Sequence, residues 1–263
     1  AIFGILCNQS LLERNNIAIP TSFAQMRDET IPALKAAGIE VSTCMMDLPG
    51  YPFQFFFNVA NTGIVNTLEG RAWQNDFLAG KQTASEFLQS SKEYFQQWID
   101  CGLINATNSD MSISARRAYF KEGHTAFWVG TSYFFSQNGE ETGDQYCLIP
   151  YLSENGDQNI YPTQENRFYG LNAQLKEPGN EQKLEDALHV LEVMSTLEGF
   201  TAILGENTTN IASMRSFELP ENSPYASVVA EINRGYCAPL IYNGWEDYIV
   251  AFGEAVIDWI NGE

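Results

Sequence analysis

The sequence has few basic residues and almost no histidine. Its 263 residues include 14 lysines and arginines against 33 aspartates and glutamates, a formal net charge of −19, and two histidines. A strongly anionic chain without a basic run repels phosphates, so nucleic acid is excluded as a partner. No stretch approaches the roughly 20 apolar residues that a bilayer requires, so no membrane-spanning segment is predicted.

Cysteine is present but follows no pattern. The five residues Cys7, Cys44, Cys101, Cys147 and Cys237 are an odd number, and their spacing matches neither a zinc ligand pair nor a dense disulfide framework. We interpret them as single buried thiols. Cysteine usage therefore leaves the redox compartment of the protein open.

Motifs for catalysis, cofactors and metals are also missing. The sequence contains no GxxxxGK[ST] loop, no GxGxxG after a predicted strand and no HExxH. The segment from Gly130 to Phe134 lacks the second glycine of a nucleophile elbow, and we interpret it as an ordinary turn between a strand and a helix. The sequence thus predicts no cofactor, no metal site and no catalytic residue. A glycoside-active enzyme stays open as an alternative, because paired carboxylates cannot be picked out among 33 acids.

The apolar content is sufficient for a substantial core. Aromatic residues make up 13% of the chain, and the wider hydrophobic set makes up 44%. Hydrophobic patterns predict strands at 39–46, 125–129, 146–149 and 168–175, with helices between them and the clearest helix at 180–197. This alternation predicts an α/β layered fold with a largely parallel sheet.

Aromatic side chains are placed at the ends of several predicted elements. Tyr51 and Phe53 lie where a helix starts, Tyr133 follows the Gly130 turn, and Trp245 opens the last helix beside Glu246. Flat aromatic faces with a few polar groups are how proteins bind sugars. For each of these residues, burial in the core is the alternative interpretation.

Four segments, in order, carry a resemblance to a known family. Residues 4–17 are similar to the hinge strand and following helix of family 1 extracellular solute-binding proteins, with Cys7 and Gln9 in place of Tyr and Lys. Residues 20–25 are similar to its helix start PTTWxE, and residues 120–130 to its pattern FxxGxxAM…NGxW. The run from Leu171 to Gly199 is similar to INA…AxxFLxxLxxxEG. The chain therefore resembles the sugar-capturing component of an ABC importer, of the maltodextrin-binding type.

The resemblance implies a hinged receptor with periplasmic-binding-protein-like type II lobes, each three-layered. Residues 9–167 and 211–263 would form the second lobe, and 168–210 would belong to a first lobe that is otherwise absent. The protein would be non-catalytic, extracellular or periplasmic, and lipid-anchored in its intact form. It would bind an oligosaccharide and deliver it to an ABC permease. The implied ligand-binding residues are Tyr51, Phe53, Ser132, Tyr133, Trp245 and Glu246, although Ser132 and Tyr133 stand where the family has Trp.

Two further expectations follow from the resemblance. The apolar face of residues 180–204 would cover the first lobe, so in this chain we expect self-association through that segment or disorder within it. We also expect weak ligand binding, because a hinged receptor needs both walls of its cleft. The remaining alternative is an acidic extracellular interaction module, which would bind a partner protein instead of a small molecule.

Overall fold

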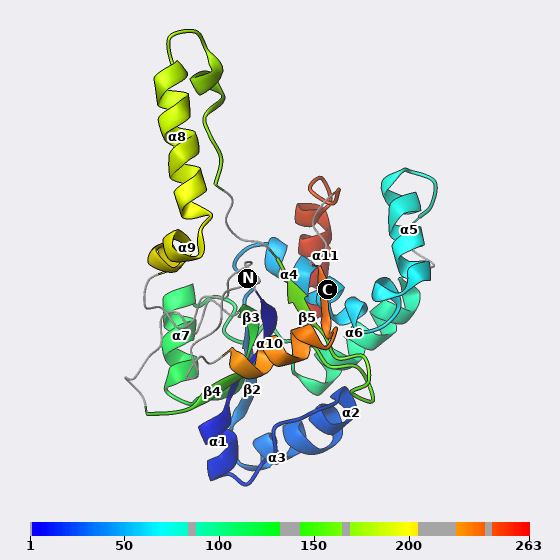
Figure 1. Ribbon diagram of the computed structural model, residues 1–263. Helices are drawn as coiled ribbons and strands as arrows, with labels where there is room; N and C mark the ends of the chain where they lie inside the picture. Colours follow the sequence, from blue (N-terminus) through cyan, green and yellow to red (C-terminus); the bar gives the residue numbers. More distant parts are fainter. Residues whose placement is uncertain (1, 84–87, 132–142, 165–168, 205–224, 240–243) are drawn as a thin grey trace.

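The protein is described by a computed structural model at residues 2–83, 88–131, 143–164, 169–204, 225–239 and 244–263 (Figure 1). The candidate site residues Ser132 and Tyr133 lie outside this description. The described strands are β1 (Phe3–Asn8), β2 (Glu40–Cys44), β3 (Thr125–Thr131), β4 (Tyr146–Ile149), β5 (Tyr161–Thr163) and β6 (Cys237–Pro239).

The strands form a sheet of order β2-β3-β1-β4 and a pair β5-β6. β2 is parallel to β3, and β5 is parallel to β6, whereas β1 is antiparallel to both β3 and β4. An antiparallel bridge between Ile2 and Thr163 gives β5 the same direction as β3. Every described strand except β1 therefore runs the same way, which confirms the predicted α/β class with a largely parallel sheet.

Helices cover both faces of this sheet. Trp128 of β3 packs against Phe120 of α7, with ring centroids 5.9 Å apart, and Ser42 of β2 donates a hydrogen bond to the carbonyl of Leu103, just after α6. Ser42 pairs with Phe127, which points to the face opposite Trp128, so α7 and the end of α6 lie on opposite faces. The helices of the body are α1 (Gln9–Arg14), α2 (Phe23–Gln25), α3 (Ile31–Ala36), α4 (Gly50–Asn61), α5 (Leu68–Leu78), α6 (Gln89–Cys101), α7 (Ile113–Lys121), α10 (Ala226–Asn233) and α11 (Ile249–Asn261).

Helix starts follow the capping residues that the sequence provides. The Ser22 side chain accepts a hydrogen bond from the backbone N–H of Gln25, and the Gln25 side chain accepts one from the Thr21 N–H. Ser112 caps α7 in the same way, by accepting from the Ala115 N–H. These contacts satisfy backbone donors that the first helical turn leaves free, and they fix where these helices begin.

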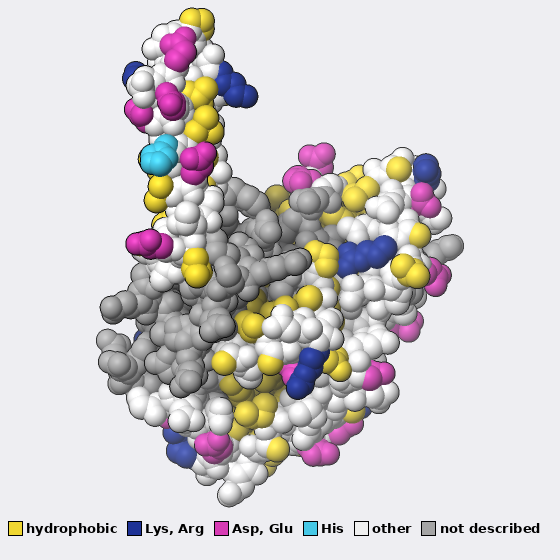
Figure 2. Space-filling model, viewed as in Figure 1, with side chains coloured by type: hydrophobic (Ala, Val, Ile, Leu, Met, Phe, Trp, Pro, Cys, Tyr) yellow, Lys and Arg dark blue, Asp and Glu magenta, His cyan; other side chains and the backbone are white. Residues whose placement is uncertain are grey.

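One helix stands away from this body. α8 (Glu181–Met194) has no buried residue, and α9 (Leu197–Leu204) follows it at an angle (Figure 1). Figure 2 shows hydrophobic side chains along this projection, and Leu188 and Leu197 are each 47% exposed. The helical pattern predicted at 180–204 is therefore confirmed, and its apolar face is left uncovered in this chain.

Three local predictions need correction. The strand predicted at 168–175 is absent from residues 169–175, where a short 3-10 helix (Ala173–Lys176) begins because Asn172 caps the Gln174 N–H. α5 was not predicted, although Trp73 and Phe77 stand at helical spacing and Thr67 caps it by accepting from the Gly70 N–H. α11 starts at Ile249 rather than at Trp245, since residues 246–248 form a turn.

Candidate functional site

The carboxyl ends of the strands meet at one edge of the sheet. Because β1 alone among the described strands runs in the opposite direction, the ends of β2, β3, β4, β5 and β6 and the start of β1 share this edge. Open α/β sheets bind ligands in the crevice beyond the carboxyl ends of their strands. The residues that follow β2, β3 and β6 are therefore the first candidates for a binding site, and they include all six residues singled out in the sequence.

The loop after β2 carries Asp47 and leads into α4. Arg116 of α7 is completely buried, and its Nη1 donates a hydrogen bond to the Asp47 Oδ1 at 3.0 Å. The Arg116 Nη2 also donates to the carbonyl of Met111 at 2.8 Å. A buried guanidinium needs such partners, because an unpaired charge in the core is costly. The ion pair thus holds the β2–α4 loop against α7.

Tyr51 lies in the first turn of α4, beside this ion pair. Its side chain is partly buried, and its backbone N–H donates to the Leu48 carbonyl at 3.0 Å. Burial raises the pKa of the Tyr51 hydroxyl, and the negative charge of Asp47 raises it further, while Arg116 lowers it. The hydroxyl therefore stays protonated at neutral pH and is available as a hydrogen-bond donor at the carboxyl edge.

The start of α11 packs directly on the β2–α4 loop. A Cβ added at Gly253 would lie only 1.9 Å from the carbonyl oxygen of Pro49, so the approach requires glycine. A Cβ added at Gly50 would lie 3.8 Å from the Ile249 side chain. The residues before and within the first turn of α11 are consequently neighbours of the α4 N-terminus at the same edge of the sheet.

Phe53 and Trp245 are brought together, but inside the core. Phe53 is 0% exposed and Trp245 is 1% exposed, and their ring centroids lie 6.0 Å apart. Phe77 of α5 stacks on Trp245 with a centroid distance of 4.7 Å and an interplanar angle of 22°. Phe53 and Trp245, which the resemblance implied as ligand-binding residues, are therefore core residues in this structure, and neither ring offers a free face to a ligand.

The exposed residues of this region are different ones. Glu246 is exposed, as is Tyr248, whose ring is 48% exposed and packs on the edge of Trp245 at 5.8 Å. Leu48 is 57% exposed on the loop before α4. Tyr248 was not among the residues singled out in the sequence. Its position three residues after Trp245 would place it on the same helical face, where a similar burial is expected, so no signal in the sequence indicated its exposure.

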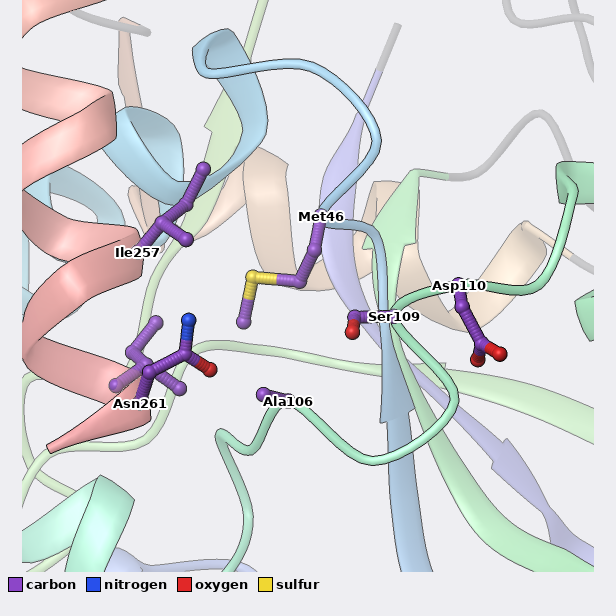
Figure 3. Close-up of a pocket in the computed structure, with 7 residues that line it drawn as sticks. Met46, Ala106, Ser109, Asp110, Ile257 and Asn261 are labelled. Carbon is purple, nitrogen blue, oxygen red and sulfur yellow. The ribbon is translucent and has the colours of Figure 1, made fainter.

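A small cavity of about 220 Å³ lies next to this region (Figure 3). Met46, which follows β2, points into it between the loop at Ala106 and Ile257 of α11, and the Asp110 carboxylate points away from Met46 (Figure 3). Its volume is below the roughly 300–1,000 Å³ of typical ligand pockets. None of the four described site residues Tyr51, Phe53, Trp245 and Glu246 lines it, so we assign the candidate site to the open carboxyl edge instead.

Metal and membrane features give no further site. In the described ranges, no group of three or more His, Cys, Asp or Glu side chains is placed to hold a metal ion. No helix within those ranges has the length and apolar character to cross a membrane. The groups that the carboxyl edge offers to a ligand are aromatic rings, the hydroxyl of Tyr51 and the carboxylates of Asp47 and Glu246.

Comparisons with known proteins identify the fold. No family model and no curated protein matches the sequence. Among solved structures, a chitin oligosaccharide binding protein superposes with a TM-score of 0.72 at 19% identity, over 99% of this chain and 65% of its own. The solute-binding protein RafE in complex with raffinose superposes with a TM-score of 0.73 at 13% sequence identity, over 98% of this chain and 66% of its own. A family 1 extracellular solute-binding protein from Bifidobacterium longum subsp. infantis superposes with a TM-score of 0.73 at 10% identity, over 99% of this chain and 66% of its own.

The chain thus has the fold of family 1 solute-binding proteins over nearly its whole length, as the sequence resemblance implied. It spans about two thirds of the length of these structures.

Proposed function

We propose that the protein is the carbohydrate-binding, non-catalytic component of an ABC importer and that its ligand is an oligosaccharide. The observation that carries this proposal is the fold match over 98–99% of the chain to solute-binding proteins, two of which are named for oligosaccharide or raffinose binding. The proposal places the protein outside the cytoplasmic membrane, with a lipid anchor and a permease partner in the intact form.

The carboxyl edge of the sheet is the proposed sugar-binding wall. Tyr51, Glu246 and Tyr248 supply one hydroxyl donor, one carboxylate acceptor and one exposed ring at the adjoining starts of α4 and α11. Sugars are bound by this combination of ring stacking and hydrogen bonds to hydroxyls. Ser132 and Tyr133, which follow β3, remain proposed members of the same wall. Phe53 and Trp245 pack beneath this wall and hold the N-terminus of α4 next to the residues before α11.

We also propose the lobe assignment that the resemblance implied. Residues 9–167 and 211–263 form the second lobe, and 168–210 belong to the first. Support comes from the projection of α8 and from the uncovered apolar side chains of α8 and α9, which a first lobe would bury. Without that cover, two copies of the chain would meet through the same helices. Hinge closure between the lobes would enclose the sugar and set its affinity.

The test is an NMR titration of the ¹⁵N-labelled chain with raffinose and with a chitin oligosaccharide. Only one wall of the cleft is present, so we expect affinity near the millimolar range, which is about −4 kcal/mol. The amide signals of Tyr51, Glu246 and Tyr248 should shift in a saturable way. The substitution Tyr248→Ala should weaken binding roughly tenfold, and Tyr236→Ala, at a tyrosine that is 37% exposed before β6, should leave it unchanged.

The other outcomes separate the alternatives. Release of cleaved sugar during the titration would establish the glycoside-active enzyme and refute the non-catalytic role. Shifts that gather away from the carboxyl edge would refute the proposed wall. The absence of any saturable shift with either sugar would refute carbohydrate binding by this chain and favour the acidic interaction module.

A further inference from the structure

Two cysteines meet across the ladder between β1 and β4. In this antiparallel pair Cys7 stands directly opposite Cys147, although the two are far apart in the sequence. Both are free thiols in the structure, with Cys7 completely buried and Cys147 partly exposed. Their spacing along the chain gave no indication of this pairing, which only the register of the two strands produces.

The geometry of opposed residues suits a disulfide. Directly opposed residues of antiparallel strands have Cα atoms about 4.5 or 5.5 Å apart, depending on their position in the hydrogen-bond pattern. Disulfides join Cα atoms separated by about 4.4–6.8 Å, so both positions qualify without movement of the backbone. Opposed side chains also point to the same face of the sheet.

The other cysteines lack such an arrangement. Cys44 of β2 is buried opposite Val129, Cys101 ends α6, and Cys237 begins β6 opposite Tyr161. In the ladders that the structure describes, none of these three faces a second cysteine.

The two opposed thiols differ in reactivity. A hydrogen bond from the Cys7 thiol to the Cys147 sulfur raises the pKa of Cys7 well above its ordinary value, and burial adds to this. The same hydrogen bond lowers the pKa of Cys147 against the opposing effect of its own burial. Because the thiolate is the nucleophile in thiol–disulfide exchange, Cys147 is both the accessible and the more reactive sulfur.

We propose that Cys7 and Cys147 are a site of covalent cross-linking, closed as a disulfide by exchange with a low-molecular-weight disulfide. The Cys147 thiolate attacks one sulfur of the oxidant, forms a mixed disulfide and releases one thiolate, which takes up the proton that Cys147 lost. Cys7 then attacks the Cys147 sulfur, the bond to the carried thiol breaks, and that thiol leaves with the proton from Cys7. Two electrons pass from the cysteine pair to the oxidant, which becomes two thiols.

The cross-link would join an edge strand to the centre of the sheet. β4 lies at the end of the order β2-β3-β1-β4 and pairs only with β1 among the strands of that sheet. The loop closed between the two cysteines contains most of the body, and disulfides that close long loops are the most stabilising in the chain-entropy account. We expect oxidation to raise the melting temperature by roughly 5–15 °C.

The experiment uses the chain with the substitutions Cys101→Ser and Cys237→Ser, which remove the other partly exposed thiols. The folded protein is incubated with glutathione disulfide and analysed by intact mass and by peptide mapping without reduction. We expect the loss of two hydrogens, no retained glutathione and a linked peptide pair containing Cys7 and Cys147. Cys44 should stay reduced, because burial raises the pKa of its thiol to about 11.

Single substitutions in that background test the order of the steps. Cys7→Ser should retain one glutathione on Cys147, and Cys147→Ser should take up none, since Cys7 is inaccessible. A lasting glutathione adduct on Cys147 while Cys7 is present, or two free thiols after the incubation, would overturn the proposal. Both results can be read from the background protein alone, so they do not depend on whether the single variants fold.

Discussion

Removal of the Trp245 ring is expected to destabilise the fold rather than to remove a ligand contact. Trp245 is 1% exposed, and its ring centroid lies between 4.7 and 6.4 Å from those of five other aromatic residues. These partners come from α4, from α5 and from the turn before α11, namely Phe53, Phe57, Trp73, Phe77 and Tyr248. The ring therefore holds three segments together that are far apart in the sequence.

The magnitude follows from this burial. Replacing a core Phe or Trp by Ala costs about 3–5 kcal/mol, and aromatic pairs contribute about 0.5–1.5 kcal/mol beyond their buried area. Because Trp245 has five aromatic partners, we expect Trp245→Ala to lower the free energy of unfolding by about 4–5 kcal/mol, near the upper end of this range. At about 2–4 °C per kcal/mol for a chain of this size, the melting temperature should fall by roughly 10–15 °C.

The assay is urea and thermal unfolding followed by near-UV circular dichroism, with Trp245→Phe as the matched control. Phe keeps an aromatic ring and removes an indole N–H that has no hydrogen-bond partner among the described residues, so its cost should be under about 2 kcal/mol. Tyr248→Ala, at a half-exposed ring, should cost less than Trp245→Ala. If Trp245→Ala kept wild-type stability while sugar binding was lost, the packing role assigned here would be refuted.

Three other predictions concern the same regions. Asp47→Ala should lower the free energy of unfolding measured in urea by about 2–3 kcal/mol, because it leaves the buried Arg116 without its carboxylate. This is less than the usual cost of about 3–5 kcal/mol for breaking a buried ion pair, because the Asp47 side chain is 30% exposed. An unchanged urea midpoint would contradict this prediction. Leu188→Glu should abolish the self-association seen by light scattering without a loss of stability, because Leu188 is 47% exposed. If the unsubstituted chain is monomeric, the proposed contact between two copies through residues 180–204 is refuted. Tyr51 should ionise above the ordinary tyrosine pKa in a spectrophotometric titration. Because its folded pKa is raised, the stability that it contributes is present below the unfolded pKa of about 10 and is lost as pH rises through the folded value; phenolate formation at or below pH 10 would contradict this.

The local structure was largely predictable because it depends on neighbours in the sequence. Ser22 and Ser112 cap the helices that they precede, and the helical spacing at 180–197 forms α8. The strand predicted at 168–175 was not found in the residues described there, since a strand needs a partner strand as well as a pattern. Tyr51 and Glu246 come after β2 and β6, and residues that follow parallel strands share one edge of the sheet. Their role in binding stays a prediction.

The sequence by itself determined the class of the fold, the net negative charge and the starts of several helices, since each depends on composition or on short-range patterns. Only the tertiary structure decided which aromatic residues are exposed. Phe77 covers Trp245 because the end of α5 packs on the turn that precedes α11, and Tyr248 in that turn is left half exposed. The opposition of Cys7 and Cys147 likewise depends on the register of β1 and β4. Both outcomes depend on contacts between residues far apart in the chain, which no local pattern encodes.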